Sequence, residues 1–365
     1  MKLAFKTLLA LAPLALAAPA SAQFSPPPPD QPDMTIDAAF RAATIESLAT
    51  KVEASYVFPD LGKTVARTLR DRKKKGRYDS ITSAMEFSDS LNADLRALAH
   101  DHHLRVHYSS RPWPARHGAE NGPPPAEERE RFLADARRRN WGFERVERLA
   151  GNVGYVELRN FESGAEAGAV AQTAMEFLRN SDALIFDLRR NGGGDPNMIV
   201  LLLSHLYGDD DRVHVNDFYQ RGDSLMPQFW TTTTIPGPRF VDQPVYVLTS
   251  HRTGSAAEEF SYDIKMLKRG TLVGETTAGG ANPGGFARLN DHFVAFIANG
   301  RAINPVSKTN WEGVGVEPDV KVKAEDALTT AHVAAIEALK AKTTDPDLTA
   351  MYGRALEVAK NMPKP

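Results

Sequence analysis

One serine of the sequence lies where a buried strand gives way to a helix. In the segment TSHRTGSAAEE (249–259) an apolar strand ends, a polar loop with Gly254 follows, and a helix of small residues begins at Ser255. A serine there projects from the carboxyl edge of a parallel sheet, the edge at which α/β folds place their sites. The helix start also offers free backbone N–H groups to a developing oxyanion. Ser255 is therefore a candidate nucleophile.

The same serine has a purely structural explanation. Ser255 and Glu258 have the S-x-x-E spacing of a capping box, and serines at the N-cap are common without any catalysis. The local motif alone favours the cap. Ala256 and Ala257 count slightly toward catalysis, because small side chains let another group approach the helix start closely.

A second motif, DLRRNGGGD (187–195), follows another buried strand. Glycines permit positive φ angles and let backbone N–H groups face a ligand, which favours an oxyanion- or peptide-binding turn at Gly192, Gly193 and Gly194. A phosphate-binding loop is disfavoured, because G-x-x-x-x-G-K-[ST] is absent and Pro196 follows closely. An ordinary glycine-rich loop remains the alternative.

A serine nucleophile needs a base. The histidines between residues 100 and 107 are the main candidates, and His251 and His292 are less plausible. A metal site is the rival interpretation of this cluster. It is disfavoured because the adjacent His102 and His103 point apart in most backbones, and no carboxylate has the usual ligand spacing. No metal and no cofactor are expected.

A carboxylate that could orient the base lies further along the chain. Glu312 stands next to Gly313 in the segment TNWEGVGVEPD (309–319), which has the glycines of a rigid turn. A polar loop leading to an edge strand at 320–322 is the alternative, and the local chemistry favours it.

The overall composition excludes several classes of function. The 365 residues are 25% charged and 42% hydrophobic, as in ordinary globular proteins. A net charge of −2 and a pI of about 6.6 argue against a dedicated nucleic-acid binder. The chain has no cysteine, so it can have no disulfide, thiol nucleophile, cysteine metal site or lipidated cysteine.

Residues 1–22 have the pattern of a signal peptide. Lys2 and Lys6 precede an apolar run, and the small residues 20–22 (ASA) supply a cleavage site, so the mature chain is expected to begin at Gln23. A transmembrane anchor is the alternative, but the apolar run is short and no charged stop follows it. The expected location is the periplasm or the outside of the cell, with no membrane span after cleavage.

The elements that must position these residues fall into successive regions. We expect a Pro-rich linker at 23–35, an N-terminal helical bundle ending in a histidine-bearing strand at 36–109, a charged and Pro-rich insertion at 110–150, an α/β core at 151–325, and C-terminal helices at 326–365.

Strand–helix–strand units in series predict a parallel sheet with helices on its faces. Strands are predicted at 153–158, 183–188, 245–249 and 271–274, with helices at 166–179, 196–207 and 256–268. Residues 127–139 have the charge pattern of a solvated helix, and 293–297 and 302–304 are predicted to pair as a hairpin.

Taken together, these segments resemble the S41 serine peptidases, which include the carboxyl-terminal processing peptidases, the tricorn core and the interphotoreceptor retinoid-binding protein repeats. The resemblance covers about residues 36–325, and the matching segments occur in the family's order: DHH (101–103), NVGYVE (152–157), LIFDLRRNGGG (184–194), TSHRTGSAAEE (249–259), LVGE (272–275) and GVGVEPD (313–319). It implies a ClpP/crotonase-like α/β core with an N-terminal helical bundle. A PDZ domain is not expected, since 110–150 is too short and too charged for one.

The resemblance also indicates a branch of the family. In the processing peptidases the base is a lysine about 25 residues after the serine, but here that position is Gly280 and no lysine lies between Arg269 and Arg301. The chain is more similar to the tricorn-like and retinoid-binding-protein-like branch, which uses serine, histidine and glutamate.

On that pattern each role falls on a residue of this chain. The resemblance implies the following assignments: Ser255 as nucleophile, His103 as general base, Glu312 as orienting acid, Gly193 and Ala256 as oxyanion hole, and Gly192 and Gly194 as binding residues. The tricorn-type serine before the histidine is replaced by His102. Which histidine is the base, and how Glu312 reaches it, therefore stay undecided.

The function expected from these features is hydrolysis of peptide bonds in a peptide or protein substrate, through an acyl-enzyme on Ser255. Two alternatives remain. One is a non-catalytic carrier of apolar ligands on the same fold, in which Ser255 is only a cap, and the other is a small-ester hydrolase. The sequence does not indicate an oligomeric state.

Overall fold

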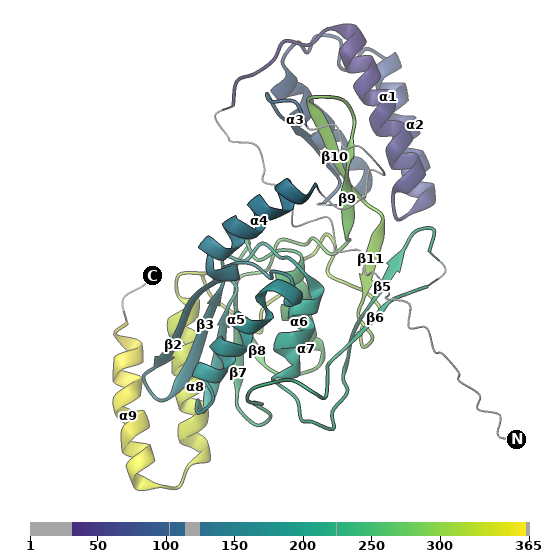
Figure 1. Ribbon diagram of the computed structural model, residues 1–365. Helices are drawn as coiled ribbons and strands as arrows, with labels where there is room; N and C mark the ends of the chain where they lie inside the picture. The colour runs from purple at the N-terminus through teal and green to yellow at the C-terminus, as the bar shows by residue number, and fades with distance from the viewer. Residues whose placement is uncertain (1–30, 102, 114–124, 224, 363–365) are drawn as a thin grey trace, which may run out of the picture.

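The computed structural model describes residues 31–101, 103–113, 125–223 and 225–362. The predicted signal peptide, most of the predicted linker and His102 lie outside these residues. Figure 1 shows the N-terminal helices at one end of the molecule and a larger α/β body at the other.

The larger body is built on a six-stranded sheet with the order β12-β8-β7-β4-β3-β2. Its strands are β2 (Phe143–Leu149), β3 (Val153–Leu158), β4 (Ala183–Asp187), β7 (Val245–Thr249), β8 (Thr271–Gly274) and β12 (Val320–Lys321). Neighbouring strands from β3 to β12 run parallel. β4 and β7 are buried along their whole length, as the apolar runs in the sequence predict.

Strand β2 corrects the prediction that residues 110–150 form an insertion outside the core. It pairs antiparallel with β3 at the edge of the sheet. An edge strand can direct charged side chains to solvent, and Glu144 and Arg145 are exposed. The charges that suggested an insertion are therefore compatible with a strand.

Helices cover both faces of this sheet (Figure 1). One apolar cluster joins the sheet to α5 (Gly164–Phe177), α6 (Pro196–Ser204) and α7 (Ala256–Met266), and another joins it to α8 (Ala327–Lys342) and α9 (Pro346–Lys360). The predicted fold class, a mostly parallel sheet with flanking helices and N-terminal helices, is confirmed.

The N-terminal helices are α1 (Ala38–Ser55), α2 (Pro59–Lys74) and α3 (Ala84–Ala99). The side chains of Asp37 and Ser83 cap α1 and α3 by accepting backbone N–H groups, and α2 begins with a proline. The charged helix α4 (Ala126–Arg138) and the short turn η2 (Asn140–Gly142) lead into β2. Among the described helices, none is both long and apolar enough to span a bilayer.

The predicted hairpin at 293–304 is wrong. β10 (Phe293–Ala298) pairs antiparallel with β1 (Arg105–Tyr108) and β9 (Gly284–Arg288), whereas β11 (Gly300–Ile303) joins β5 (His214–Gln220) and β6 (Gln228–Trp230) in another sheet. The two segments are neighbours in sequence, but each has its partners elsewhere in the chain. The β1–β10 pairing holds the segment before β1, which contains His103, against the core.

Candidate active site

Ser255 has a backbone conformation that helix capping does not require. Its φ and ψ angles are 52° and −121°, whereas the capping residues Asp37 and Ser83 have φ angles of −97° and −87°. A non-glycine residue with positive φ is strained, and such strain occurs preferentially at functional sites.

The hydroxyl of Ser255 makes no capping hydrogen bond. The Glu258 carboxylate accepts the N–H of Ser255 at 2.8 Å, as in a capping box, but the N–H of Glu258 donates to the backbone carbonyl of Ser255. The cap therefore does not account for the serine side chain.

The loop before Ser255 is fastened to the glycine-rich loop after β4. Ser250 donates its hydroxyl to the carbonyl of Arg189 (2.6 Å), and the N–H of Gly254 donates to the carbonyl of Asn191 (3.0 Å). A Cβ atom at Gly193 would lie 2.7 Å from the Cβ of Ser255, and the φ of this glycine is +118°. The two motifs found in the sequence are thus in contact, and only glycine fits at 193.

The predicted oxyanion donors differ in their present partners. Ala256 is the first residue of α7, where a backbone N–H has no acceptor within its own helix. The N–H of Gly193 donates to Oδ1 of Asn191 at 2.9 Å, and the Asn191 side chain is fully buried. Gly194 lies against the carbonyl of Phe161, where a Cβ would be 1.9 Å from that oxygen. Gly192 is exposed. The binding role predicted for Gly192 and Gly194 stays a prediction.

The His103 ring packs on Gly280 and is tilted against Phe296 with ring centroids 5.5 Å apart. A Cβ at Gly280 would lie 2.7 Å from Cε1 and 2.8 Å from Nε2 of His103. The imidazole therefore occupies the space that a side chain at 280 would need. In the processing peptidases, the resemblance assigns the catalytic lysine to the position of Gly280. A lysine at 280 and the His103 ring would need the same space, so the two side chains exclude each other.

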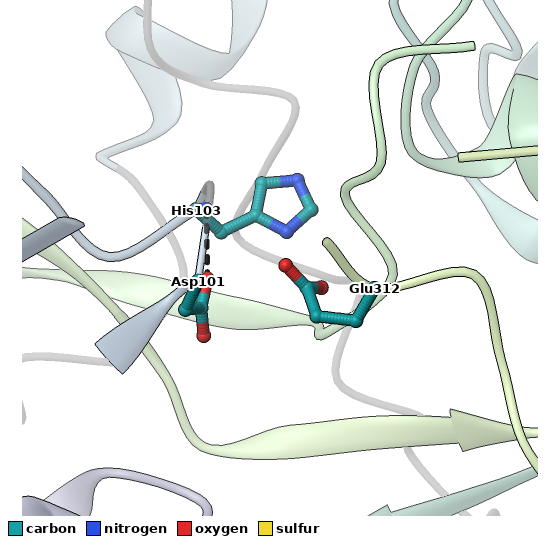
Figure 2. A group of neighbouring side chains, drawn as sticks. All are labelled: Asp101, His103 and Glu312. Atoms are coloured by element: carbon teal, nitrogen blue, oxygen red, sulfur yellow. Dashed lines mark hydrogen bonds between the residues drawn. The ribbon is translucent and has the colours of Figure 1, made fainter. Parts of the chain in front are cut away.

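Glu312 and Asp101 flank His103. One donor or acceptor atom from each of the three side chains lies within 4.8 Å of the other two. Figure 2 shows the Glu312 carboxylate directed toward Nδ1 of the imidazole, and this nitrogen is buried without a hydrogen bond. Burial raises the pKa of Glu312, as does the negative charge of Asp101, while hydrogen bonds from Ala281 and Asn282 and the charge of His103 lower it.

Asp101 has a role beside His103 that the sequence pattern did not predict. Its Oδ1 accepts the N–H groups of His103 (2.8 Å) and Leu104 (3.1 Å), and its Oδ2 accepts the hydroxyl of Tyr56 (3.0 Å). Burial, followed by the charge of Asp101, raises the pKa of Tyr56. The signal that could have found Asp101 is its place two residues before His103, the spacing of an Asx turn.

The three side chains also have the composition of a metal site. However, both Asp101 oxygens accept hydrogen bonds from the protein, and Oε2 of Glu312 accepts the N–H groups of Ala281 (2.6 Å) and Asn282 (2.9 Å). Because these oxygens already accept hydrogen bonds, the two carboxylates are better suited to orienting the His103 imidazole than to binding a metal ion.

The structure brings Ser255, His103 and Glu312 into one neighbourhood. Oε2 of Glu258 accepts the N–H groups of both Ser255 (2.8 Å) and Gly280 (3.0 Å), and the His103 ring lies on Gly280. His102, the other candidate base, lies outside the described residues.

Comparison with known proteins places the chain in a family. The model for peptidase family S41 matches residues 152–322, and the model for the N-terminal domain of S41 peptidases in eukaryotic IRBP matches residues 37–134. Together these two matches cover more than half of the chain.

Curated relatives match over shorter stretches. The carboxyl-terminal-processing peptidase 1 of Arabidopsis thaliana chloroplasts is 24% identical over 182 residues, which are 50% of this chain and 36% of the relative. The tricorn protease of Thermoplasma volcanium is 31% identical over 136 residues, which are 37% of this chain and 12% of the relative. The chain thus spans only about a third, or less, of the length of these relatives.

Solved structures share the fold. A putative peptidase from Parabacteroides merdae has a TM-score of 0.54 at 19% identity, with 82% of this chain and 95% of that chain covered. A lipoprotein from Streptococcus agalactiae has a TM-score of 0.51 at 15% identity, with 82% and 96% covered. With the family models spanning both the N-terminal helices and the α/β core, the chain belongs to peptidase family S41.

Proposed function

We propose that this chain is an exported serine peptidase with Ser255 as nucleophile, His103 as general base and Glu312 as the acid that orients the base. The observation that supports this most strongly is the conformation of Ser255. It is strained at the start of α7, and its hydroxyl is not used as a cap. Membership of the S41 family and the names of the relatives support a peptide or protein substrate.

The proposed chemistry is acyl transfer. His103 takes the proton of the Ser255 hydroxyl as the oxygen attacks the scissile carbonyl, and then gives this proton to the leaving amine. Glu312 stabilises the imidazolium from the Nδ1 side. Since Nδ1 has no hydrogen bond in this structure, this contact is expected to tighten when substrate binds. Water then hydrolyses the acyl-enzyme.

The oxyanion of the tetrahedral intermediate requires backbone donors. The N–H of Ala256 is in the position that supports this role best, because it opens α7 directly after the nucleophile. Gly193 supplies the second donor if its N–H leaves Oδ1 of Asn191 and donates to the oxyanion instead.

A fluorophosphonate probe and a peptide-hydrolysis assay test this proposal. Wild-type protein should be labelled on Ser255, while Ser255→Ala should be unlabelled and should lose at least about a thousandfold in kcat/KM without unfolding. His103→Ala should lose nearly as much, because the members of a triad act as a unit. Ser261→Ala is the matched control, since Ser261 is a second, buried serine of α7 whose hydroxyl bonds to Ala257.

The outcomes separate the competing functions. Undiminished hydrolysis by Ser255→Ala would reject the nucleophile. Labelling without peptide hydrolysis would indicate a small-ester hydrolase, and absence of labelling together with binding of apolar ligands would indicate a carrier. Export is supported by the sequence of residues 1–22. If export with cleavage occurs, the protein isolated from its source should have the mass of a chain that begins at Gln23. A mass that includes residues 1–22 contradicts export.

A further inference from the structure

Four consecutive backbone N–H groups, those of residues 279–282, join the buried carboxylate of Glu258 to the half-buried carboxylate of Glu312. Gly279 donates to Oε1 of Glu258 (2.6 Å) and Gly280 to Oε2 of Glu258 (3.0 Å). Ala281 and Asn282 both donate to Oε2 of Glu312, at 2.6 and 2.9 Å. One short segment therefore sets the separation between the helix of the proposed nucleophile and the proposed orienting acid.

Glu258 receives two further hydrogen bonds. The N–H of Ser255 donates to Oε2 (2.8 Å) and the hydroxyl of Thr277 to Oε1 (2.6 Å). All four partners of this side chain are donors, and it is 0% exposed. A helix cap needs only the contact with Ser255, so capping does not explain the other three.

The loop that contains Glu312 is hydrogen-bonded to the same segment, residues 277–282. The hydroxyl oxygen of Thr277 accepts the N–H of Val316 (2.7 Å), and the carbonyl of Gly279 accepts the N–H of Gly313 (2.9 Å). The buried indole of Trp311 donates to the carbonyl of Gly280 at 3.1 Å. Glu258 and Thr277 thus connect three segments: the start of α7, residues 277–282, and residues 311–316.

The His103 ring lies against residue 280 of the segment 277–282. It packs on Gly280, the residue at which the segment passes from Glu258 to Glu312. A shift of the segment would therefore move the surface that supports the imidazole relative to Ser255. Misplacement of a catalytic group by about 1 Å can cost on the order of a hundredfold in rate.

We infer that Glu258 is a positioning residue, whose carboxylate holds residues 277–282 against the start of α7 and thereby sets the distances among Ser255, His103 and Glu312. This inference rests on the proposed function. Burial raises the pKa of Glu258, while the hydrogen bonds from Thr277, Gly279, Gly280 and Ser255 lower it. Only the ionised form offers acceptors to all four donors.

The substitution Glu258→Gln tests the inference with little change in volume. The amide keeps one oxygen, but its NH₂ group must face at least one backbone N–H or hydroxyl donor, so the segment must move. We expect the variant to fold, with a fluorophosphonate labelling rate and a kcat lower by about tenfold to a hundredfold and a KM changed much less. Circular dichroism and the Tm establish that the variant is folded at the assay temperature.

Glu259→Gln is the matched control. Glu259 is the next residue of α7 and is also buried, but its carboxylate accepts from Asn216 of β5 and makes none of the contacts described for Glu258. It should keep labelling and kcat within about twofold of wild type. A folded Glu258→Gln that is labelled as fast as wild type overturns the inference and leaves the proposed function intact. Failure of wild-type protein to be labelled or to cleave peptides overturns both.

Thr277→Val keeps the test available if Glu258→Gln does not fold. Valine preserves the shape of threonine but removes the hydroxyl that joins Glu258 to Val316. We expect a folded protein with labelling slower by about threefold to tenfold. An unchanged labelling rate in this variant also contradicts the inference.

Discussion

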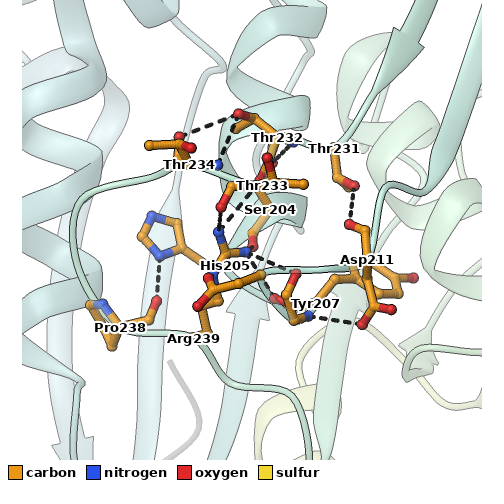
Figure 3. A network of polar contacts seen from close by, with 12 residues as sticks. Ser204, His205, Tyr207, Asp211, Thr231, Thr232, Thr233, Thr234, Pro238 and Arg239 are labelled. Carbon is orange, nitrogen blue, oxygen red and sulfur yellow. Dashed lines mark hydrogen bonds and ion pairs between the residues drawn. The ribbon is translucent and has the colours of Figure 1, made fainter.

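The start of α7 and the end of α6 are two helix termini with many polar contacts. They differ in backbone strain and in how their polar side chains are used. At the end of α6, the Arg239 guanidinium donates to the backbone carbonyls of Ser204 (2.7 Å) and Tyr207 (2.9 Å), and Figure 3 shows how the segment 231–239 gathers around it. The last carbonyls of a helix lack partners within the helix, and a cation near them is favourable. This network satisfies groups that helix formation leaves unpaired.

The same segment is bound to the end of α6 at further points. The N–H of Thr232 donates to the hydroxyl of Ser204 (2.9 Å), and Nδ1 of His205 lies 2.7 Å from the carbonyl of Pro238 (Figure 3). None of these residues has a positive φ angle. At the start of α7, in contrast, Ser255 is strained and its hydroxyl caps nothing. A dense polar network therefore does not by itself indicate function, whereas a strained serine without a capping hydrogen bond supports the proposal that Ser255 is the nucleophile.

The largest effect that we expect from this comparison follows Gly193→Ala. The new Cβ would lie 2.7 Å from Cβ of Ser255 and 3.0 Å from the carbonyl of Gly254, at a φ of +118°. The start of α7 must shift, so kcat/KM for peptide hydrolysis should fall by at least about a hundredfold. Gly353→Ala in α9 is the control, since nothing lies within 4 Å of the added Cβ. Near-normal activity of Gly193→Ala would show that Ser255 does not depend on this contact.

Arg239→Ala should give an intermediate effect, and on stability alone. The carbonyls of Ser204 and Tyr207 lose their donor, so the free energy of unfolding should fall by about 1–3 kcal/mol, while the folded variant is labelled at the wild-type rate. Arg131→Ala removes an exposed ion pair with Glu127 and should change stability by less than about 0.5 kcal/mol. Slower labelling of folded Arg239→Ala would mean that the two helix ends are not independent.

The smallest effect that we expect concerns Glu259, which lies one turn beyond Ser255 but contacts β5. Burial, and the negative charge of Asp195, raise the pKa of Glu259 to about 7 from 4.5, while a hydrogen bond from Asn216 lowers it. The folded protein then binds this proton more tightly than the unfolded chain, so the free energy of unfolding falls as pH rises from about 4.5 to about 7.

Denaturant unfolding at several pH values checks this expectation. Glu259→Gln should flatten the decrease in this window without slowing labelling. Asp263 should retain part of the slope, because burial raises its pKa even when the charge of Glu259 is removed. An equal slope in wild type and variant would contradict the assignment to Glu259.

Much of the α/β body could be predicted from local pattern. The strands at 153–158, 245–249 and 271–274 have the predicted bounds, and α6 and α7 begin at Pro196 and Ala256, as predicted. Buried strands are short apolar runs and the helices repeat their apolar residues at helical spacing, so both can be recognised within a few residues. The antiparallel strand β2 could not, because its exposed charges obscure the pattern of a strand.

The partners of the proposed nucleophile were only partly predictable. The sequence resemblance pointed to His103 and Glu312, and the structure brings them within 4.8 Å of each other together with Asp101. The contacts of Asp101 with Tyr56, and of Glu258 with Thr277, Gly279 and Gly280, join segments that are 19 to 45 residues apart. No local periodicity encodes such contacts.

The amino-acid sequence by itself determined the fold class, the positions of the main strands and helices, and the place of Ser255 at the start of a helix after a buried strand. These depend on hydrophobic periodicity and on glycine and proline positions, which act over a few residues. Only the tertiary structure decided that Ser255 has a strained backbone and a hydroxyl without a capping hydrogen bond, that β1 pairs with β10 to bring His103 onto Gly280, and that residues 279–282 bridge Glu258 and Glu312. Those features arise from packing between distant segments, which is settled when the whole chain folds.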